Sequence, residues 1–256
     1  MDFSYRTTSC NGVLYLSKTP EYFASLTFIE NSPSKWKDIS GSFCGDKRQS
    51  PLNIVTSHVV TDSKLNNFTF VNFSSEHAIK SIVNTGHTGT QTKTSTLSGG
   101  GLNGTYSTIQ FHFHWGDTEH HPGSEHTIDD HRYPMEVQHL SLKKGLAVEQ
   151  AIEKSDGIAV LGFFINVCPT TFTAQTHVDL TKFYRYMGSL TTPMCNEAVA
   201  WTVFQEPINI HKDLSTAAPA ESITFPLNYT CDQPNQSKLL RNGQEACFVC
   251  VLFTSG

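Results

Sequence analysis

Two histidines, His112 and His114, stand two residues apart in the stretch QFHFHWG at residues 110–116. Successive side chains of a β-strand point to opposite faces, so both imidazoles would share a face with Gln110 and the aromatic residues would take the other. Two imidazoles at this spacing can bind one metal ion, and a neighbouring strand would have to supply a third ligand. Cross-strand polar pairs on a half-buried sheet produce the same spacing, so the pair alone leaves a metal site and an ordinary strand both open.

The segments around this pair have the composition of β-strands. Short apolar runs rich in β-branched and aromatic residues alternate with Gly, Asn, Ser and Pro. This pattern predicts a mainly β fold of α+β class. One short helix is expected at 147–154 and a loop at 98–104, where glycines permit positive φ. The predicted strands cover 68–73, 78–84, 108–115, 135–142, 158–167 and 198–204.

The composition limits the partners and the compartment. The chain has 256 residues, a formal net charge of −5 and no run of like charges, which argues against nucleic acid or an acidic membrane surface as a partner. Seven cysteines and five Asn-x-Ser/Thr sequons favour an exported glycoprotein, although the first residues lack the basic and apolar regions of a signal peptide. The apolar run near the C-terminus is either a remnant of a lipid-anchor tail or a last strand. The sequons stand at Asn67, Asn72, Asn103, Asn228 and Asn235.

Two further stretches continue the pattern that begins with QFHFHWG. GSEHTID at 123–129 and the strand MEVQHL at 135–140 follow it in an order that resembles the α-class carbonic anhydrases. The resemblance implies one domain at 36–256 with a large, mostly antiparallel twisted central sheet and short peripheral helices, after an N-terminal extension at 1–35. It also implies a monomer. The segment near 168–183 departs from the family pattern, because it is shorter than the family's. The same family order continues through RQSPLNIV (48–55), NTGH (84–87), GIAVLGFF (157–164), YMGSLTTP (186–193) and WTVFQEPI (201–208).

This resemblance implies zinc-dependent, reversible hydration of carbon dioxide to bicarbonate and a proton. Zinc sites of the family use three imidazoles, and the metal lowers the pKa of a water to about 7 so that hydroxide is available at neutral pH. His112 and His114 match two of the ligands. Thr191 and Glu125 match the pair that orients the nucleophile, and His87 matches the proton shuttle, a role that a near-neutral pKa suits.

Further positions match the surroundings of the family's zinc site. Gln110 and Glu136 match residues that hold the zinc ligands from behind. An apolar wall that admits a small uncharged gas is implied as well, although each of its residues could equally be ordinary core. The positions of the implied substrate pocket are Leu140, Val160, Leu190, Thr192, Val199 and Trp201.

The third zinc ligand is where this sequence departs from the family pattern. That pattern reads Glu, an apolar residue and His, whereas MEVQHL places Gln138 two residues after Glu136. His139 is adjacent, but strand alternation points it to the other face unless a β-bulge shifts the register. The flanking motifs keep their spacing, so we expect no bulge. We expect the amide oxygen of Gln138 to bind zinc weakly while Glu136 accepts its N–H, because zinc prefers nitrogen and thiolate donors.

Within the family, the positions of the cysteines resemble those of one branch, the extracellular, membrane-anchored branch that is similar to carbonic anhydrase IV. In that branch the positions of Cys44 and Cys195 carry a disulfide, which would contribute about 4–5 kcal/mol in the chain-entropy model; two free buried thiols are the alternative. The resemblance therefore implies a protein that is secreted or anchored to the outer cell surface.

Two functions remain open. The retained histidines, threonine and glutamate favour an extracellular zinc enzyme with reduced hydration activity. Gln138 and the shortened segment favour a catalytically silent module that binds a partner through the same scaffold. A binding module has no need of a proton shuttle or an oriented threonine. Because His87 and Thr191 are both present, the sequence favours the enzyme.

Overall fold

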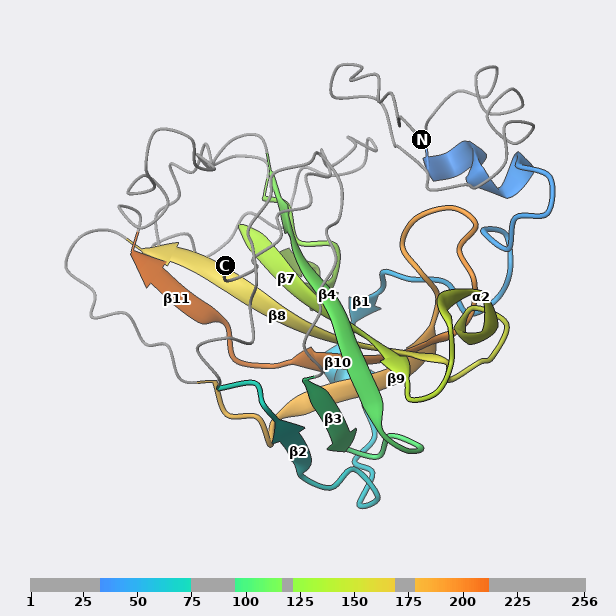
Figure 1. The fold of residues 1–256 in the computed structure, drawn as a ribbon. Helices are drawn as coiled ribbons and strands as arrows, with labels where there is room; N and C mark the ends of the chain where they lie inside the picture. Colours follow the sequence, from blue (N-terminus) through green and yellow to red (C-terminus); the bar gives the residue numbers. More distant parts are fainter. Residues whose placement is uncertain (1–32, 75–94, 117–121, 169–177, 212–256) are drawn as a thin grey trace, which may run out of the picture.

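One large curled β-sheet dominates the computed structural model, which describes residues 33–74, 95–116, 122–168 and 178–211 (Figure 1). The strands run across this sheet in the order β2-β3-β4-β7-β8-β10-β9, and β11 pairs with β8 outside this path. The strands are β2 (Phe68–Val71), β3 (Thr96–Gly99), β4 (Tyr106–Trp115), β7 (Met135–Lys143), β8 (Ile158–Cys168), β9 (Phe183–Gly188), β10 (Val199–Phe204) and β11 (Ile208–His211).

The long strand β8 lies near the middle of the sheet and organises both sides of it. It pairs antiparallel with β7 on one side, and parallel with both β10 and β11 on the other. The remaining ladders, including β4 with β7, are antiparallel. The prediction of a mainly β fold on a large, mostly antiparallel sheet is therefore confirmed, and the parallel ladders that the large sheet shows in the described residues both involve β8.

The other elements are short. A small sheet joins β1 (Asn53–Ile54), β5 (Thr127–Ile128) and β6 (His131–Arg132). Within the described ranges, 3₁₀-helices cover Pro33–Asp38 and Thr56–His58, and the α-helix α2 covers Val148–Ala151. The helix expected at 147–154 is confirmed but ends earlier, because residues 152–157 continue as turns. No helix in the described ranges is long and apolar enough to cross a membrane.

The structure also corrects the predicted strand boundaries. Ser98 and Gly99 end strand β3, although we expected a loop from 98 to 104; their backbone pairs with β2. The glycines that follow do form a turn with positive φ, as expected at Gly100 and Gly101. Strands β9 and β11 were not among the predicted strands, and the strand expected at 78–84 lies outside the described residues.

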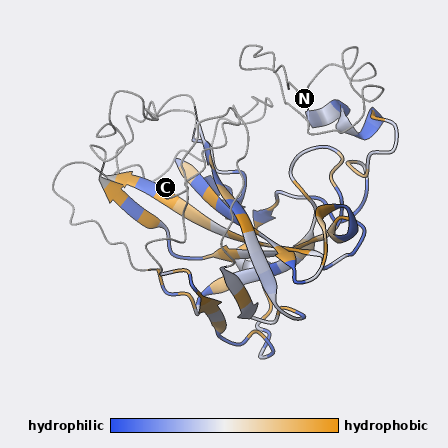
Figure 2. Ribbon diagram, in the orientation of Figure 1, coloured by the Kyte–Doolittle hydropathy of each residue, from blue (hydrophilic) through white to orange (hydrophobic). Residues whose placement is uncertain are grey.

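The core lies on both faces of the sheet, because the central strands bury residues of either alternation. All six residues of β10 are buried. Figure 2 shows hydrophobic and hydrophilic bands along β7, and in its first half Met135 and Val137 alternate with Glu136 and Gln138, so these two polar side chains share one face. On the opposite face Phe111, Trp115, Met135, Val137, Ile165 and Val167 form one buried apolar cluster.

Candidate functional site

The pairing of β4 with β7 decides which polar side chains meet. His112 lies opposite Gln138, and His114 lies opposite Glu136. The ladder's register shift falls between Thr108 and Gln110, and the pairing from Gln110 to Trp115 is continuous. The imidazole rings of His112 and His114 are 4.9 Å apart between centroids. Strand alternation therefore places two imidazoles, one amide and one carboxylate on the same face.

His139 lies on the other face of β7. It pairs with Phe111, and the two rings stack with centroids 5.0 Å apart and an interplanar angle of 10°. Phe73 and Phe163 lie 6.0 Å and 6.4 Å from the same imidazole. His139 thus belongs to an aromatic part of the core, away from His112 and His114.

The side chain of Gln138 connects three neighbours. Its Oε1 lies 3.2 Å from Nε2 of His112. Its Nε2 donates to Oε2 of Glu125 at 2.8 Å and to Oε1 of Glu136 at 2.9 Å. A carboxylate can only accept, so the NH₂ group must face the two glutamates and the oxygen must face His112. Gln138 is 2% exposed, so water competes little for these bonds.

Burial sets the charges of this cluster. It lowers the pKa of His112 to about 3, together with the charge of His114, and it lowers the pKa of His114 to about 4. Both imidazoles are therefore neutral near pH 7, the form in which an imidazole binds a metal. Burial alone would raise the pKa of Glu136, but the charge of His126 and hydrogen bonds from it lower that pKa to about 2.

The pKa of Glu125 shifts in the opposite direction to that of Glu136. Burial and the nearby charge of Glu136 raise its pKa to about 7, although hydrogen bonds from Gln138 and Thr191 oppose the rise. Its Oε2 also lies 3.3 Å from Nε2 of His114. The structure therefore brings Glu125 and Thr191 together, and it places the glutamate between the threonine and the histidine face of the sheet.

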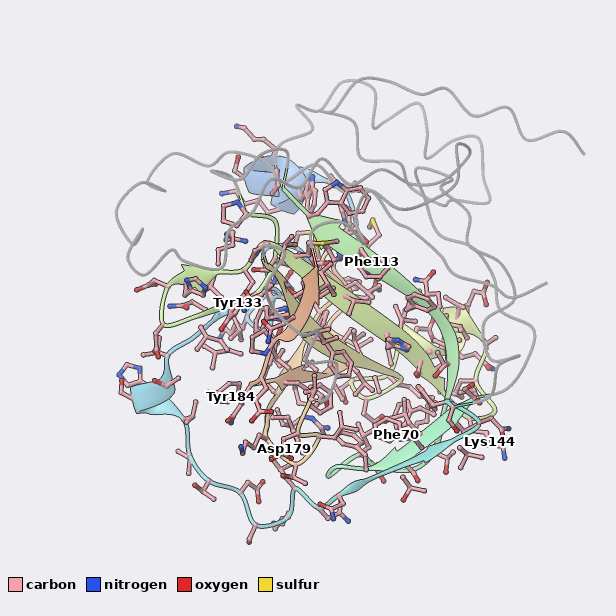
Figure 3. The ribbon with its side chains drawn as sticks, turned by 90° about the vertical axis from the view of Figure 1, so that its left-hand side faces the viewer. Phe70, Phe113, Tyr133, Lys144, Asp179 and Tyr184 are labelled. Atoms are coloured by element: carbon pink, nitrogen blue, oxygen red, sulfur yellow. A yellow bond between two sulfur atoms is a disulfide. The ribbon has the colours of Figure 1, made fainter. Side chains whose placement is uncertain are left out.

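Thr191 belongs to a loop that the N-terminal segment holds. The predicted disulfide between Cys44 and Cys195 is confirmed, with Cα atoms 4.9 Å apart, and Figure 3 shows the chain's side chains with this sulfur bond drawn in yellow. Beside it, Arg48 donates from Nε to Oε2 of Glu197 at 3.1 Å and from its backbone N to Oε1 at 2.5 Å. The loop after β9 is thus tied to a segment about 150 residues earlier by a covalent and an ionic contact.

The other residues that the sequence predicted at the site differ in burial and in whether the structure describes them. Gln110 is half-buried on β4, Thr192 is exposed, and His87 lies outside the described residues. The five apolar positions of the expected pocket wall all belong to or pack against one cluster, which contains Val160, Val199 and Trp201 as buried members and Leu140 and Leu190 as half-buried ones.

Three polar residues of the site were not identified from the sequence as site residues. His126 is fully buried, and its Nδ1 lies 2.8 Å from Oε1 of Glu136. Tyr186 and Ser50 continue the contacts from there. His126 stands in the GSEHTID motif, so its type and place were visible, but only the fold shows that it meets Glu136.

The donors present decide how well a zinc ion would fit. The described ranges hold no group of three His, Cys, Asp or Glu side chains that could bind a metal. The donors that converge are two neutral imidazoles and the amide oxygen of Gln138, which lies 3.2 Å from Nε2 of His112. An amide oxygen can bind zinc but is a poorer donor than a third imidazole, so this donor set is compatible with the ion.

Comparison with known proteins identifies the family. The family model described as eukaryotic-type carbonic anhydrase matches residues 31–178 and 169–224, and its two matched parts meet within the segment that we expect to be shortened. Carbonic anhydrase 4 of Oryctolagus cuniculus is 35% identical over 213 residues, which cover 71% of this chain and 67% of the relative.

Two further relatives agree. Putative carbonic anhydrase 3 of Caenorhabditis elegans is 34% identical over 216 residues, which cover 70% of this chain and 83% of the relative. Carbonic anhydrase 1 of Mus musculus is 31% identical over 252 residues, which cover 83% and 95%. These relatives support the prediction of a lyase of the carbonic anhydrase type. The chain belongs to the eukaryotic-type carbonic anhydrase family.

Proposed function

We propose that this chain catalyses the reversible hydration of carbon dioxide to bicarbonate and a proton, with a zinc site that Gln138 weakens. The observation that carries this proposal is the orientation of the Gln138 amide. Its oxygen faces His112 because its nitrogen donates to Glu125 and Glu136. The third ligand position therefore presents an acceptor atom to the two imidazoles rather than a hydrogen.

Each polar residue has a separate task in this reaction. His112, His114 and Gln138 would hold the zinc ion, which when bound supplies a Lewis acid that lowers the pKa of a water. Thr191 and Glu125 would orient the attacking oxygen, and the buried Glu136 keeps the Gln138 amide turned. His87 would carry the proton to solvent. Leu140, Val160, Leu190, Thr192, Val199 and Trp201 would surround the substrate.

A silent binding module is the second candidate, and one specific observation favours it. Gln138 gives both buried carboxylates a donor while its oxygen faces His112, so Gln138, Glu125 and Glu136 have hydrogen-bond partners without a metal ion. Such a site would hold the scaffold together while the chain binds a partner elsewhere.

We also propose an extracellular place for the protein, either secreted or lipid-anchored at the cell surface, as a monomer. The Cys44–Cys195 disulfide supports an oxidising compartment. Three sequon asparagines, Asn67, Asn72 and Asn103, are exposed, as a glycosylated residue must be.

The first experiment is the zinc content of the purified protein beside that of Gln138→His. We expect substoichiometric zinc and slow hydration in the unaltered chain, and full occupancy with faster hydration in the variant. The matched control is His139→Leu, which removes the adjacent imidazole on the other face and should leave zinc content unchanged. An unaltered protein that is empty at millimolar zinc and inactive, beside a variant that fills, would select the silent module.

A further inference from the structure

A chain of buried hydrogen bonds runs away from Gln138 through the interior. Oε1 of Glu136 accepts from Gln138 at 2.9 Å and from Nδ1 of His126 at 2.8 Å. Oε2 of the same carboxylate accepts the backbone N–H of His126 at 2.9 Å. Glu136 and His126 are both fully buried, so these protein groups, and not solvent, fix the carboxylate.

The chain continues through Tyr186 to the N-terminal segment. The Tyr186 hydroxyl lies 2.7 Å from Nε2 of His126 and donates to Oγ of Ser50 at 2.8 Å. Oγ of Ser50 also accepts the backbone N–H of Ser189 at 3.0 Å, and the backbone N–H of Ser50 donates to Oγ of Ser189 at 2.9 Å. Ser189 lies two residues before Thr191, so the chain joins the histidine face of the sheet to the base of the loop that carries the threonine.

Packing holds this chain of hydrogen bonds rigidly at both ends. A Cβ added at Gly188 would lie 2.2 Å from Oγ of Ser50 and 2.6 Å from Cε2 of Tyr186, so only glycine fits there. A Cβ added at Gly162 would lie 3.2 Å from Oε1 of Glu136. The His126 ring also meets the Trp201 ring edge-on with centroids 4.7 Å apart. None of these groups can shift without moving its neighbours.

We propose that Tyr186 is a positioning residue that acts through His126 and Glu136 to keep the amide oxygen of Gln138 turned toward His112. The Tyr186 hydroxyl lies against Nε2 of His126 and so fixes the ring whose Nδ1 contacts Glu136. Glu136 in turn accepts only one of the two Gln138 hydrogens, and Glu125 takes the other. The metal role of this orientation rests on the proposed function, whereas the orientation itself does not.

The test compares Tyr186→Phe with Tyr184→Phe. The second tyrosine lies two residues away on the same face of β9, and its hydroxyl stands outside the chain of hydrogen bonds, so it is a matched control. The first readout needs no metal: ¹⁵N NMR of the His126 ring nitrogens and the Gln138 side-chain amide. We expect both sets of resonances to shift in Tyr186→Phe and to stay unchanged in Tyr184→Phe.

The second readout is cobalt(II) binding, followed by titration and by the visible spectrum of the bound ion. Loss of an outer partner of a metal site typically costs 10- to 100-fold in affinity, so Kd should rise about tenfold in Tyr186→Phe and stay constant in Tyr184→Phe. If Tyr186→Phe fails to fold, Ser50→Ala removes the next link and should shift the same resonances in the same direction.

The outcomes separate the two proposals. Gln138 amide resonances and cobalt affinity that stay unchanged in Tyr186→Phe, with only a lower thermal midpoint, would show a merely structural hydroxyl and overturn the positioning role. An unaltered protein that binds neither cobalt nor zinc would overturn the proposed function alone. In that case the NMR comparison in the metal-free protein still decides the role of Tyr186.

Discussion

The side-chain amide of Gln138 lies 2.8 Å from Oε2 of Glu125, a carboxylate that also accepts a hydrogen bond from Thr191. One residue therefore connects the strand face that carries His112 and His114 with the loop that carries Thr191. A histidine at position 138 would have at most two ring nitrogens for these neighbours, whereas the amide offers one oxygen and two hydrogens. Gln138→His would thus change the hydrogen bonding of both buried glutamates.

Gln138→Leu should destabilise the metal-free protein. The change leaves Glu125 and Glu136 without one donor each, and a buried acceptor that loses its partner costs about 1–3 kcal/mol. Urea unfolding followed by tryptophan fluorescence measures the loss. Gln110→Leu, a half-buried glutamine on the same face, is the control and should change the free energy of unfolding by less than about 1 kcal/mol. Equal stability of Gln138→Leu and the unaltered protein would contradict the bridging role.

His139→Leu should stabilise the protein by about 1 kcal/mol. Within the described part of the chain, Nδ1 of His139 is buried with no hydrogen bond. The ring stacks on Phe111 and also packs near Phe73 and Phe163. An apolar side chain of similar volume removes the unmet polar atom and keeps the packing. The same urea experiment tests this, and a clear loss of stability would show that the imidazole makes a favourable contact.

Asp156→Asn should lower stability at pH 7, and the loss should shrink as the pH falls into the acid range. A hydrogen bond from Lys143, with Nζ 2.6 Å from Oδ2, lowers the pKa of Asp156, and Asn103 lowers it further, although burial opposes them. A carboxyl whose pKa is depressed on folding stabilises the fold above its unfolded pKa of about 4, and this contribution disappears as pH falls through the folded pKa.

The expected loss at pH 7 is about 0.5–1 kcal/mol, because the pair is partly exposed. Thermal unfolding of both proteins between pH 3 and pH 8 measures the difference. Glu153→Gln, at an exposed acid in the turns after α2, is the control and should show no such pH dependence. A difference between Asp156→Asn and the unaltered protein that persists undiminished at pH 3 would contradict the ion pair as its source.

Replacing Cys44 and Cys195 together by serine should lower the free energy of unfolding by about 2–5 kcal/mol. The disulfide spans 151 residues and ties the Thr191 loop to the N-terminal segment. A reducing agent should weaken the unaltered protein to the same degree and leave the double variant unchanged. Insensitivity of the unaltered protein to reduction would mean that Arg48, Glu197 and the Ser50–Ser189 contacts hold the loop without the disulfide.

Much of the fold could be predicted from local sequence. The runs that became β4, β7, β8 and β10 are long and rich in β-branched and aromatic residues, so their strand character shows in composition alone. The short strand TLSG at 96–99 could not be found this way, because three of its four residues are polar or small and only pairing with β2 and β4 makes it a strand. Strand β9 was not predicted, because its last residues belong to the motif YMGSLTTP (186–193) and this stretch was not assigned a secondary structure.

The candidate site, like the fold, was predicted only in part from the sequence. The sequence alone determined that His112 and His114 share a face, that a glutamine follows Glu136 at the next position of that face, and that the motifs belong with the carbonic anhydrases. The Gln138 N–H expected to reach Glu136 does so. Only the tertiary structure decided that Glu125 takes the other hydrogen of that amide, and that His126, Tyr186 and Ser50 stand behind it. Alternation is a property of one strand, so sequence reveals it. The direction of a buried amide depends on donors and acceptors from four distant segments, which meet only when the sheet has closed over them.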